Sequence, residues 1–252
     1  MKSGLWERCG GAANLRAFSM RPFRVVEAQH LSATRVLVDS TEEQAVLEEL
    51  IDRAKPPYQP EAKGLHFLLS TPFRYPPLPH GSRFGKATEP GIWYGSKTPK
   101  TALSEAVYYR LLFLEGTRAR LPQMEFELSV FRASVRTRRG VDLTKPPFAA
   151  HRKALASKTD YRDSQNLGAS LREARVEVAL YESARDADGG TNIAVFTPRA
   201  FARKTPDPPE TWVMTVGASV IDVAKKSFFT KEYFAFRRDA FLVRGKLPAP
   251  AV

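Results

Sequence analysis

The chain has 252 residues, 43% of them hydrophobic and 26% charged, with 39 lysines and arginines against 27 acidic residues, for a formal net charge of +12. This length and composition are typical of a globular domain with a sizeable core, and they exclude wholesale disorder. The positive charge suits anionic partners, which include nucleic acids, phosphorylated metabolites and acidic proteins, but it does not distinguish among them.

The single cysteine, Cys9, excludes an intrachain disulfide and a cysteine-based zinc site. The four histidines, at positions 30, 66, 80 and 151, lack the spacing of metal ligands. No apolar run approaches the roughly 20 residues of a membrane helix. The first 20 residues lack the apolar region of a secretory signal. We therefore expect a cytoplasmic protein that neither enters a membrane nor holds a metal.

The N-terminal region is predicted to be peripheral, with a tail over residues 1–20 and a small helical extension over residues 21–62. Ser40 and Glu43 form a capping box, which satisfies free N–H groups at a helix start. Apolar residues then recur on one helical face, and Pro56 and Pro57 end the helix. We place the main domain at 63–247 and a short tail at 248–252.

Within the main domain, strands outnumber helices and do not alternate strictly with them, which favours an α+β fold. Thr98 as N-cap and Pro99 at the first helical position predict a helix that ends at Gly116. A second helix is expected through Leu167 and Leu171. The arginine-rich run 132–139 is interpreted as a solvated loop, with a nucleic-acid patch as the alternative. Strands are predicted at 64–70, 91–95, 124–130, 176–183, 192–196 and, as a pair, within 211–223.

Two side chains are the first candidates for chemistry. Glu105 lies at the margin of the apolar stripe of helix 98–116, so its carboxylate is expected to be partly buried and to need a partner. Arg83 stands between Gly81 and Gly85 in a loop, where glycine permits close approach and arginine binds phosphate. The plainer alternatives are a surface acid paired with a base and an ordinary turn with a solvated arginine.

Ser183 is a third candidate, at the end of a predicted strand. The alternative is a serine that bonds its own backbone. No neighbouring base marks it as an activated nucleophile, so the sequence does not predict a serine-hydrolase triad.

Taken in order, Arg83, Glu105 and Ser183 resemble the RES domain, which is named for its Arg, Glu and Ser. The resemblance covers about residues 64–200 and is similar to the longer branch of the family, in which a helical extension precedes the domain. The matching strings are Pro-Phe-Arg-Tyr-Pro-Pro (72–77), Gly-Ser-Arg-Phe-Gly (81–85), Gly-Ile-Trp-Tyr-Gly (91–95), Thr-Ala-Leu-Ser-Glu (101–105), Tyr-Glu-Ser-Ala-Arg (181–185) and Asn-Ile-Ala-Val-Phe (192–196).

This resemblance implies a toxin of a bacterial toxin–antitoxin pair, restrained by an Xre-type antitoxin. It implies an ADP-ribosyltransferase-like fold, with a mixed or antiparallel sheet and flanking helices. The implied substrate is NAD+, broken down by phosphorolysis or hydrolysis or used to ADP-ribosylate a protein, with no prosthetic group. Where short members have Gly-Gly-Arg-Trp, this chain has Gly-Ser-Arg-Phe, which leaves open whether Arg74 or Arg83 faces the ligand.

The same resemblance suggests roles for the candidate residues. One or both arginines would clamp the pyrophosphate, and Glu105 would stabilise the oxocarbenium-like state as the nicotinamide leaves. Tyr94 or Tyr75 would stack on the nicotinamide. Ser183 would bond the ribose or position the acceptor, with Asn192 in support. Two other readings remain: a non-catalytic, basic nucleic-acid-binding module, and a RES-like scaffold without activity.

Overall fold

The computed structural model describes residues 4–28, 37–75, 79–117 and 124–249. The helices are α1 (Leu5–Arg8), α2 (Thr41–Ala54), α3 (Phe67–Arg74), α4 (Pro99–Glu115), α5 (Arg152–Leu155) and α6 (Arg162–Glu173). The strands are β1 (Arg16–Met20), β2 (Phe23–Glu27), β3 (Trp93–Ser96), β4 (Met124–Arg132), β5 (Val135–Asp142), β6 (Val178–Glu182), β7 (Thr191–Val195), β8 (Glu210–Val216), β9 (Val220–Lys225) and β10 (Tyr233–Arg237).

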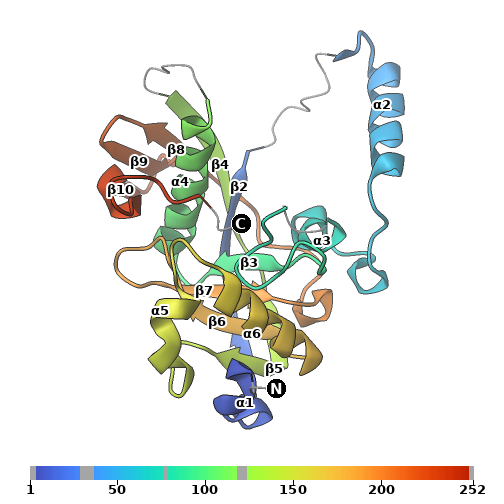
Figure 1. Cartoon of the computed structure of the whole chain (residues 1–252). Coiled ribbons are helices and arrows are strands. Elements are labelled where there is room, and N and C mark those ends of the chain that lie inside the picture. Colours follow the sequence, from blue (N-terminus) through green and yellow to red (C-terminus); the bar gives the residue numbers. More distant parts are fainter. Residues whose placement is uncertain (1–3, 29–36, 76–78, 118–123, 250–252) are drawn as a thin grey trace.

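All of these strands belong to one sheet, in the order β1-β5-β6-β7-β3-β2-β4-β8-β9-β10 (Figure 1). The pair β5–β6 is parallel, and the other neighbouring strands are antiparallel. The predicted α+β class, with a mixed sheet and flanking helices, is confirmed. Within the described ranges, no helix is long and apolar enough to span a membrane.

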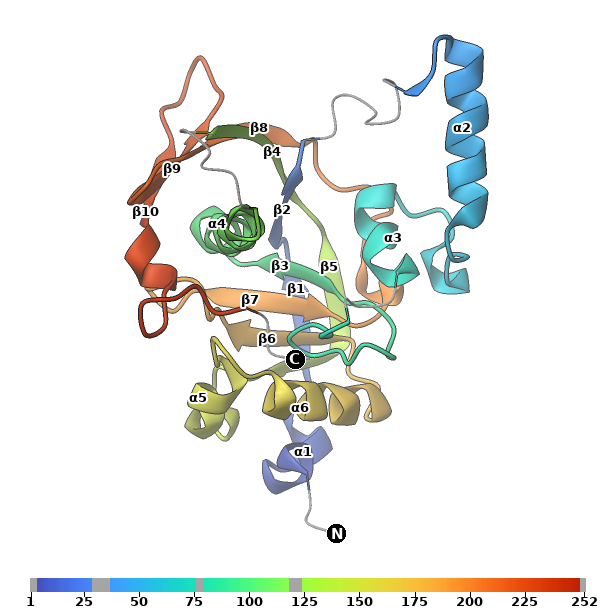
Figure 2. The ribbon, with the colours of Figure 1, turned by 45° about the horizontal axis from the view of Figure 1, so that its top comes forward.

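The sheet is nearly interrupted between β2 and β3, which share a single residue pair, Phe23 with Ser96. On either side of this point the strands continue as well-paired halves, five strands each. Figure 2 shows β2 turning away from β3 at this place. Gly95 permits the crossing, because a Cβ there would lie 2.8 Å from the Phe23 carbonyl oxygen. The split sets where the candidate site forms.

Helices cover the two halves of the sheet differently. Helix α4 lies inside the curve of β2, β4, β8, β9 and β10 (Figure 2). Its Leu103, Val107 and Leu111 are fully buried there, in a cluster that includes Trp212 and Met214. The apolar positions of α4 therefore anchor the helix to one half of the sheet. On the other half, α1, α5 and α6 lie together beyond β5 and β6 (Figure 2).

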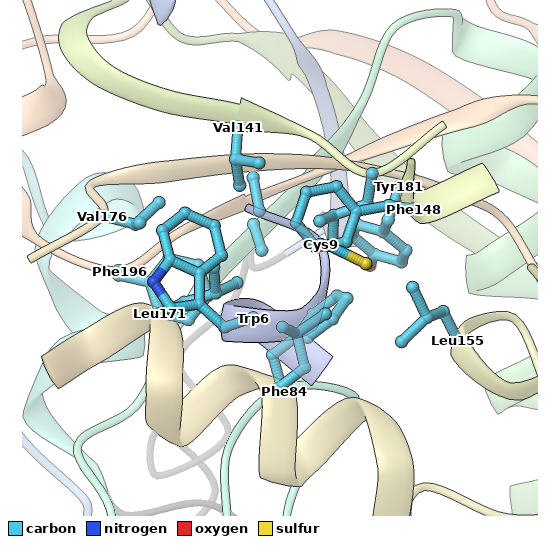
Figure 3. Close-up of a cluster of buried hydrophobic side chains, with 14 of the residues drawn as sticks. Trp6, Cys9, Phe84, Val141, Phe148, Leu155, Leu171, Val176, Tyr181 and Phe196 are labelled. Atoms are coloured by element: carbon cyan, nitrogen blue, oxygen red, sulfur yellow. The ribbon is translucent and has the colours of Figure 1, made fainter. Parts of the chain in front are cut away.

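The N-terminal residues are part of the fold, so the predicted tail at 1–20 is wrong for the described residues 4–20. Strand β1 pairs with β5 at the edge of the sheet. Trp6 and Cys9 are buried in a cluster in which the Trp6 ring stacks on Phe148 at 5.9 Å (Figure 3). Burial of these apolar groups outweighs the cost of ordering the segment.

The predicted extension at 21–62 combines an integrated strand with a projecting helix. Strand β2 lies inside the sheet, which the sequence did not predict. Helix α2 begins as expected, with the Ser40 hydroxyl accepting a 3.0 Å bond from the Glu43 N–H. It buries none of its residues and stands away from the sheet (Figures 1 and 2). Of the predicted tail at 248–252, Pro248 accepts a hydrogen bond from Tyr108, and residues 250–252 lie outside the described residues.

The predicted strand at 64–70 is wrong, because residues 67–74 form α3 instead. A short apolar run does not distinguish a buried strand from a buried helix. Pro72 lies inside this helix and cannot donate to the Leu68 carbonyl. That carbonyl accepts a 3.2 Å bond from the Trp93 indole, which compensates for the missing donor.

The arginine-rich run 132–139 is not a loop, because most of it lies in β5. Val135 and Thr137 are buried, whereas Arg136 and Arg138 are exposed. This alternation is typical of a strand with one solvated face. The loop was predicted from the number of arginines alone, without regard to this alternation.

The packing of the N-terminal segment generates a test. We expect Trp6→Ala to lower the free energy of unfolding by about 3–5 kcal/mol, the usual cost of removing a buried indole. Urea denaturation measures the effect, with Glu7→Ala as the exposed control, expected to change stability by less than about 0.5 kcal/mol. A Trp6→Ala protein as stable as the parent would contradict the observed packing.

Candidate active site

A cavity of about 270 Å³ opens where the sheet splits between β2 and β3. We call it the β2–β3 cavity. Its walls come from β2, β3, β6, β7, one face of α4, the loop carrying Arg83, and Tyr161. Its charged lining residues are Arg24, Arg83 and Glu105. The cavity therefore has a net positive lining with a single carboxylate.

Helix α4 delivers Glu105 to this cavity through a helical face that is bonded to residues 183–186. The helix starts at Thr98, whose hydroxyl accepts a hydrogen bond from the Thr101 N–H at 3.2 Å. Thr101 donates to Asp186 at 2.8 Å, and Ser104 donates to the Arg185 carbonyl at 2.6 Å. Positions 101, 104 and 105 are neighbours on one helical face, so these bonds fix the direction of Glu105.

The Glu105 carboxylate is held through one of its two oxygens. Oε1 accepts hydrogen bonds from Ser183 Oγ and Asn192 Nδ2, both at 2.6 Å. Asn192 is oriented in turn by Ser96, which donates to its Oδ1 at 2.6 Å. Among the described residues, no hydrogen bond reaches Oε2. The partly buried carboxylate thus has the partner that the sequence required, and its second oxygen remains available to a ligand.

Ser183 is buried and does not line the cavity. Its Oγ accepts hydrogen bonds from the N–H groups of Arg185 and Asp186, at 3.1 and 3.0 Å. With both acceptor positions used, the hydroxyl proton is directed to Glu105. Ser183 therefore bonds the neighbouring backbone, as the alternative interpretation of the sequence expected, and it also contacts Glu105. In this structure its hydroxyl positions the carboxylate.

Arg83 lies in the same cavity as Glu105. Its Nη1 donates to the carbonyls of Ser157 and Leu155, at 2.6 and 3.4 Å, and its guanidinium lies 4.1 Å from the Tyr161 ring centroid. In the part of the chain that the structure describes, Nε and Nη2 of Arg83 have no hydrogen-bond partner. Those donors suit an anionic oxygen.

The loop that carries Arg83 is held from several sides. Gln165 of α6 donates to the carbonyls of His80 and Ser82, each at 3.1 Å. The Tyr94 hydroxyl accepts from the Phe84 N–H at 3.1 Å and bonds Ser82 Oγ at 2.9 Å. Burial raises the pKa of Tyr94 to about 12, so the phenol is neutral at physiological pH. Arg83 is thus presented by a braced turn.

Arg185 connects the two sides of the cavity. Its backbone bonds Ser183 and Ser104 on the Glu105 side. Its guanidinium reaches the Tyr161 hydroxyl at 3.3 Å, and the Tyr161 ring lies against Arg83. Arg185 is 3% exposed, and its Nη1 has no hydrogen-bond partner among the described residues. This buried cation adds to the positive field near the cavity.

Arg24 is a cavity residue that the sequence reasoning missed. It donates from Nη1 to the Tyr94 carbonyl at 2.7 Å and packs over the Trp93 ring at 5.2 Å. Burial lowers its pKa to about 10, which leaves it charged at neutral pH. The sequence signal that could have indicated Arg24 is its position as the one charged residue in the otherwise apolar run Phe23–Val26. Tyr109, one turn beyond Glu105, and Tyr161 were also missed.

The structure separates Arg74 and Tyr75, the alternative candidates for ligand binding, from the β2–β3 cavity. Both line a second cavity of about 790 Å³ beside α3. Arg74 donates to Asp52 at 2.7 Å and to the Pro56 carbonyl at 2.5 Å, so it binds the end of α2. Of the two candidate arginines, Arg83 is the one that shares a cavity with Glu105.

The described residues contain no group of three or more His, Cys, Asp and Glu side chains that could hold a metal ion. What the β2–β3 cavity does offer is one carboxylate oxygen, guanidinium donors and several tyrosine rings. This set can bind an anionic, partly aromatic ligand and stabilise a positive charge that develops beside Glu105.

The brace formed by Tyr94 is testable. We expect Tyr94→Phe to cost about 1–3 kcal/mol, because it leaves the Phe84 N–H without its acceptor. In the parent, the folded state keeps a proton that unfolded tyrosine loses above its pKa of about 10. Stability should therefore fall from about pH 10 to about pH 12 by up to about 1.4 kcal/mol per pH unit for this group.

Chemical denaturation across that pH range measures both effects. The exposed Tyr233 provides the control, since Tyr233→Phe should change neither the stability nor its slope with pH. An unchanged slope in Tyr94→Phe would show that the hydroxyl is not buried as described.

Comparison with known proteins places the chain in a family. No curated protein matches it. Among solved structures, the crystal structure of the M. tuberculosis MbcT–MbcA toxin–antitoxin complex matches with a TM-score of 0.43 and 13% sequence identity, over 75% of this chain and 80% of that chain. The RES domain model matches residues 53–215, a range that includes Arg83, Glu105, Ser183 and Asn192. Because this match spans well over half of the sequence, the chain belongs to the RES domain family.

Proposed function

We propose that this chain is an enzyme that consumes NAD+ by cleaving the nicotinamide–ribose bond, and that it acts as the toxin of a bacterial toxin–antitoxin pair. The observation that carries the proposal is the geometry of Glu105. One carboxylate oxygen is fixed by Ser183 and Asn192, and the other is left to a cavity that also contains Arg24 and Arg83. Membership of the RES family supports the same substrate class.

In the proposed reaction, the bond between the ribose C1′ and the nicotinamide nitrogen breaks, and the nicotinamide leaves with the bonding electron pair as a neutral molecule. Positive charge then develops on C1′ and the ring oxygen. The free oxygen of Glu105 would stabilise this charge and accept a hydrogen bond from the ribose 2′-hydroxyl. Ser183 and Asn192 hold the carboxylate in place, so it need not reorganise as charge develops.

The two arginines of the cavity would bind the pyrophosphate of NAD+. The free Nε and Nη2 of Arg83 present the fork geometry that suits phosphate oxygens. The cavity volume of about 270 Å³ lies just below the range of about 300–1,000 Å³ for complete small-molecule sites. We therefore propose that it holds the nicotinamide–ribose end and the adjoining phosphate, with the adenosine outside. Tyr94 or Tyr109 would stack on the nicotinamide.

The acceptor is a nucleophilic atom that forms a bond to C1′, and any proton displaced from it passes to solvent. Inorganic phosphate would make the enzyme a phosphorylase, water would make it a glycohydrolase, and a protein side chain would make it an ADP-ribosyltransferase. All three attack the same cation. We favour NAD+ breakdown, with protein ADP-ribosylation as the alternative.

A toxin that consumes an essential cofactor requires restraint, so we propose an antitoxin of the Xre type as the protein partner. The net charge of +12 favours an acidic antitoxin surface, since opposite potentials speed association and suppress wrong partners. Covering the mouth of the β2–β3 cavity would block access of NAD+.

The role of Glu105 gives the central prediction. We expect Glu105→Gln to reduce nicotinamide release from NAD+ by about 100-fold or more, because the amide keeps the shape but loses the negative charge. Glu115→Gln is the matched control on the same helix, where the carboxylate pairs with Arg238 on the surface. It should retain full activity, and both variants should keep the thermal stability of the parent within a few degrees.

The products identify the acceptor. Purified protein is incubated with NAD+ in the presence and absence of inorganic phosphate, and nicotinamide and the ADP-ribose products are separated. Phosphate-dependent release with a phosphorylated ADP-ribose indicates phosphorolysis, whereas phosphate-independent release of ADP-ribose indicates hydrolysis. A fully active Glu105→Gln protein, or failure of the parent to release nicotinamide under any of these conditions, would contradict the proposed function.

A further inference from the structure

Two exposed apolar surfaces lie outside the candidate active site and contribute nothing to it. We call the first the acidic arm, which is helix α2 (Thr41–Ala54). We call the second the basic tip, residues 225–231, which comprises the last residue of β9 and most of the turn that leads to β10. Figures 1 and 2 show them on opposite sides of the molecule, with the sheet between them. Large apolar side chains that remain exposed together usually mark an interaction surface.

The acidic arm presents an apolar stripe that remains largely exposed among the described residues. Val46 is 57% exposed and Leu50, one turn later, is 55% exposed. The helix contains five acidic residues and one arginine, although the chain as a whole carries a charge of +12. An isolated 14-residue helix is marginal in water. The exposed apolar side chains and the negative charge of the helix therefore favour a partner surface that is apolar and basic.

The body of the protein nevertheless holds the arm firmly at its C-terminal end. Arg74, which is 9% exposed, donates to the Asp52 carboxylate and carbonyl and to the Pro56 carbonyl. It also packs over the Tyr58 ring at 4.2 Å. A buried arginine thus directs a helix none of whose residues is fully buried, which leaves the arm open to another molecule.

The basic tip has complementary chemistry. Phe228 and Phe229 are fully exposed, at 103% and 96% of the reference area. Ser227 orders the turn, because its Oγ accepts from the N–H groups of Phe229 and Thr230, each at 3.2 Å. Lysines at 225, 226 and 231 flank the rings. Lys225 and Lys226 form surface pairs with Glu210 and Glu127, and Lys231 makes no ion pair with the described residues.

We propose that the acidic arm of one copy of this chain binds the basic tip of a second copy. The phenylalanines would pack on the Val46–Leu50 stripe, and the lysines would lie beside the glutamates of the arm. Because the two surfaces are on opposite sides of one molecule, they meet only between copies. The contact is head-to-tail, so it generates a closed ring or an open chain of subunits rather than a symmetric dimer.

The charges favour a second copy over other occupants. An anionic membrane would attract the basic tip but repel the acidic arm. A single partner protein that covered both surfaces would have to extend around the molecule and change its charge from one side to the other. Head-to-tail association covers both surfaces with one kind of contact.

Complementation between two variants tests this proposal in the full-length chain. The arm variant carries Val46→Ser and Leu50→Ser, and the tip variant carries Phe228→Ser and Phe229→Ser. All four residues are more than half exposed, so the fold should persist, as circular dichroism and thermal unfolding would check. Light scattering after size-exclusion chromatography measures the mass of each variant and of their mixture over a range of concentration and salt.

We expect the parent to associate at low salt and to dissociate at high salt. Each variant alone should associate at least about tenfold more weakly, a loss of about 1.4 kcal/mol. An equimolar mixture should form dimers that grow no further, because only one functional arm and one functional tip remain to pair. As a control, Phe113→Ser removes an apolar side chain of similar exposure on α4 and should leave association unchanged.

The proposal is overturned if the parent is monomeric at every concentration. It is also overturned if both variants associate like the parent, or if their mixture stays monomeric. If the full-length parent does not self-associate but sediments with anionic vesicles, and the tip variant does not sediment with them, the tip is assigned to a membrane instead. None of these outcomes depends on NAD+ turnover, so the assembly and the proposed enzymatic activity succeed or fail separately.

Discussion

The near-interruption of the sheet between β2 and β3 is the constraint on which the site depends. Strands that ran side by side would saturate one another's backbone groups and close the space between them. Here the two strands share only the pair Phe23–Ser96, and a side chain replaces the missing ladder, because Arg24 donates to the Tyr94 carbonyl. The cavity exists because backbone pairing stops, and the group that compensates for the lost pairing is a cation that lines it.

The carboxylate of Glu105 also depends on bonds from elsewhere in the sheet. Burying part of Glu105 beside the apolar face of α4 is unfavourable unless hydrogen bonds replace the lost water. Ser183 and Asn192 supply these bonds from two different strands' ends, and both donate to the same oxygen. Of these two donors, Ser183 lies outside the lining of the cavity in which a ligand would meet the carboxylate, whereas Asn192 is part of that lining. Ser183 is buried for this reason, even though it is part of the family signature.

The two arginines that looked equivalent in the sequence have divergent surroundings. Arg83 keeps two donors free and lies against Tyr161 at the cavity wall. Arg74 bonds the last turn of α2 and its following segment. Guanidinium groups suit both tasks, because their planar fork can bind an anionic ligand or several backbone and carboxylate oxygens at once. The N-terminal extension is thereby coupled to the main domain through Arg74, one of the two candidates for the ligand-facing arginine.

The sequence by itself determined the local features that depend on near neighbours. The caps at Ser40 and Thr98, the buried stripe of α4 and the alternation of β4 all follow from interactions within a few residues. The order of Arg83, Glu105 and Ser183 also predicted the family. The tertiary structure alone decided the helix at 67–74, whose Pro72 is tolerated because a distant indole bonds the freed carbonyl. It also decided that residues 4–20 join the core, that Arg24 faces the cavity and that Arg74 does not. Each of these outcomes depends on contacts between residues far apart in the chain, and no pattern of neighbouring residues encodes which partner a buried polar group will find.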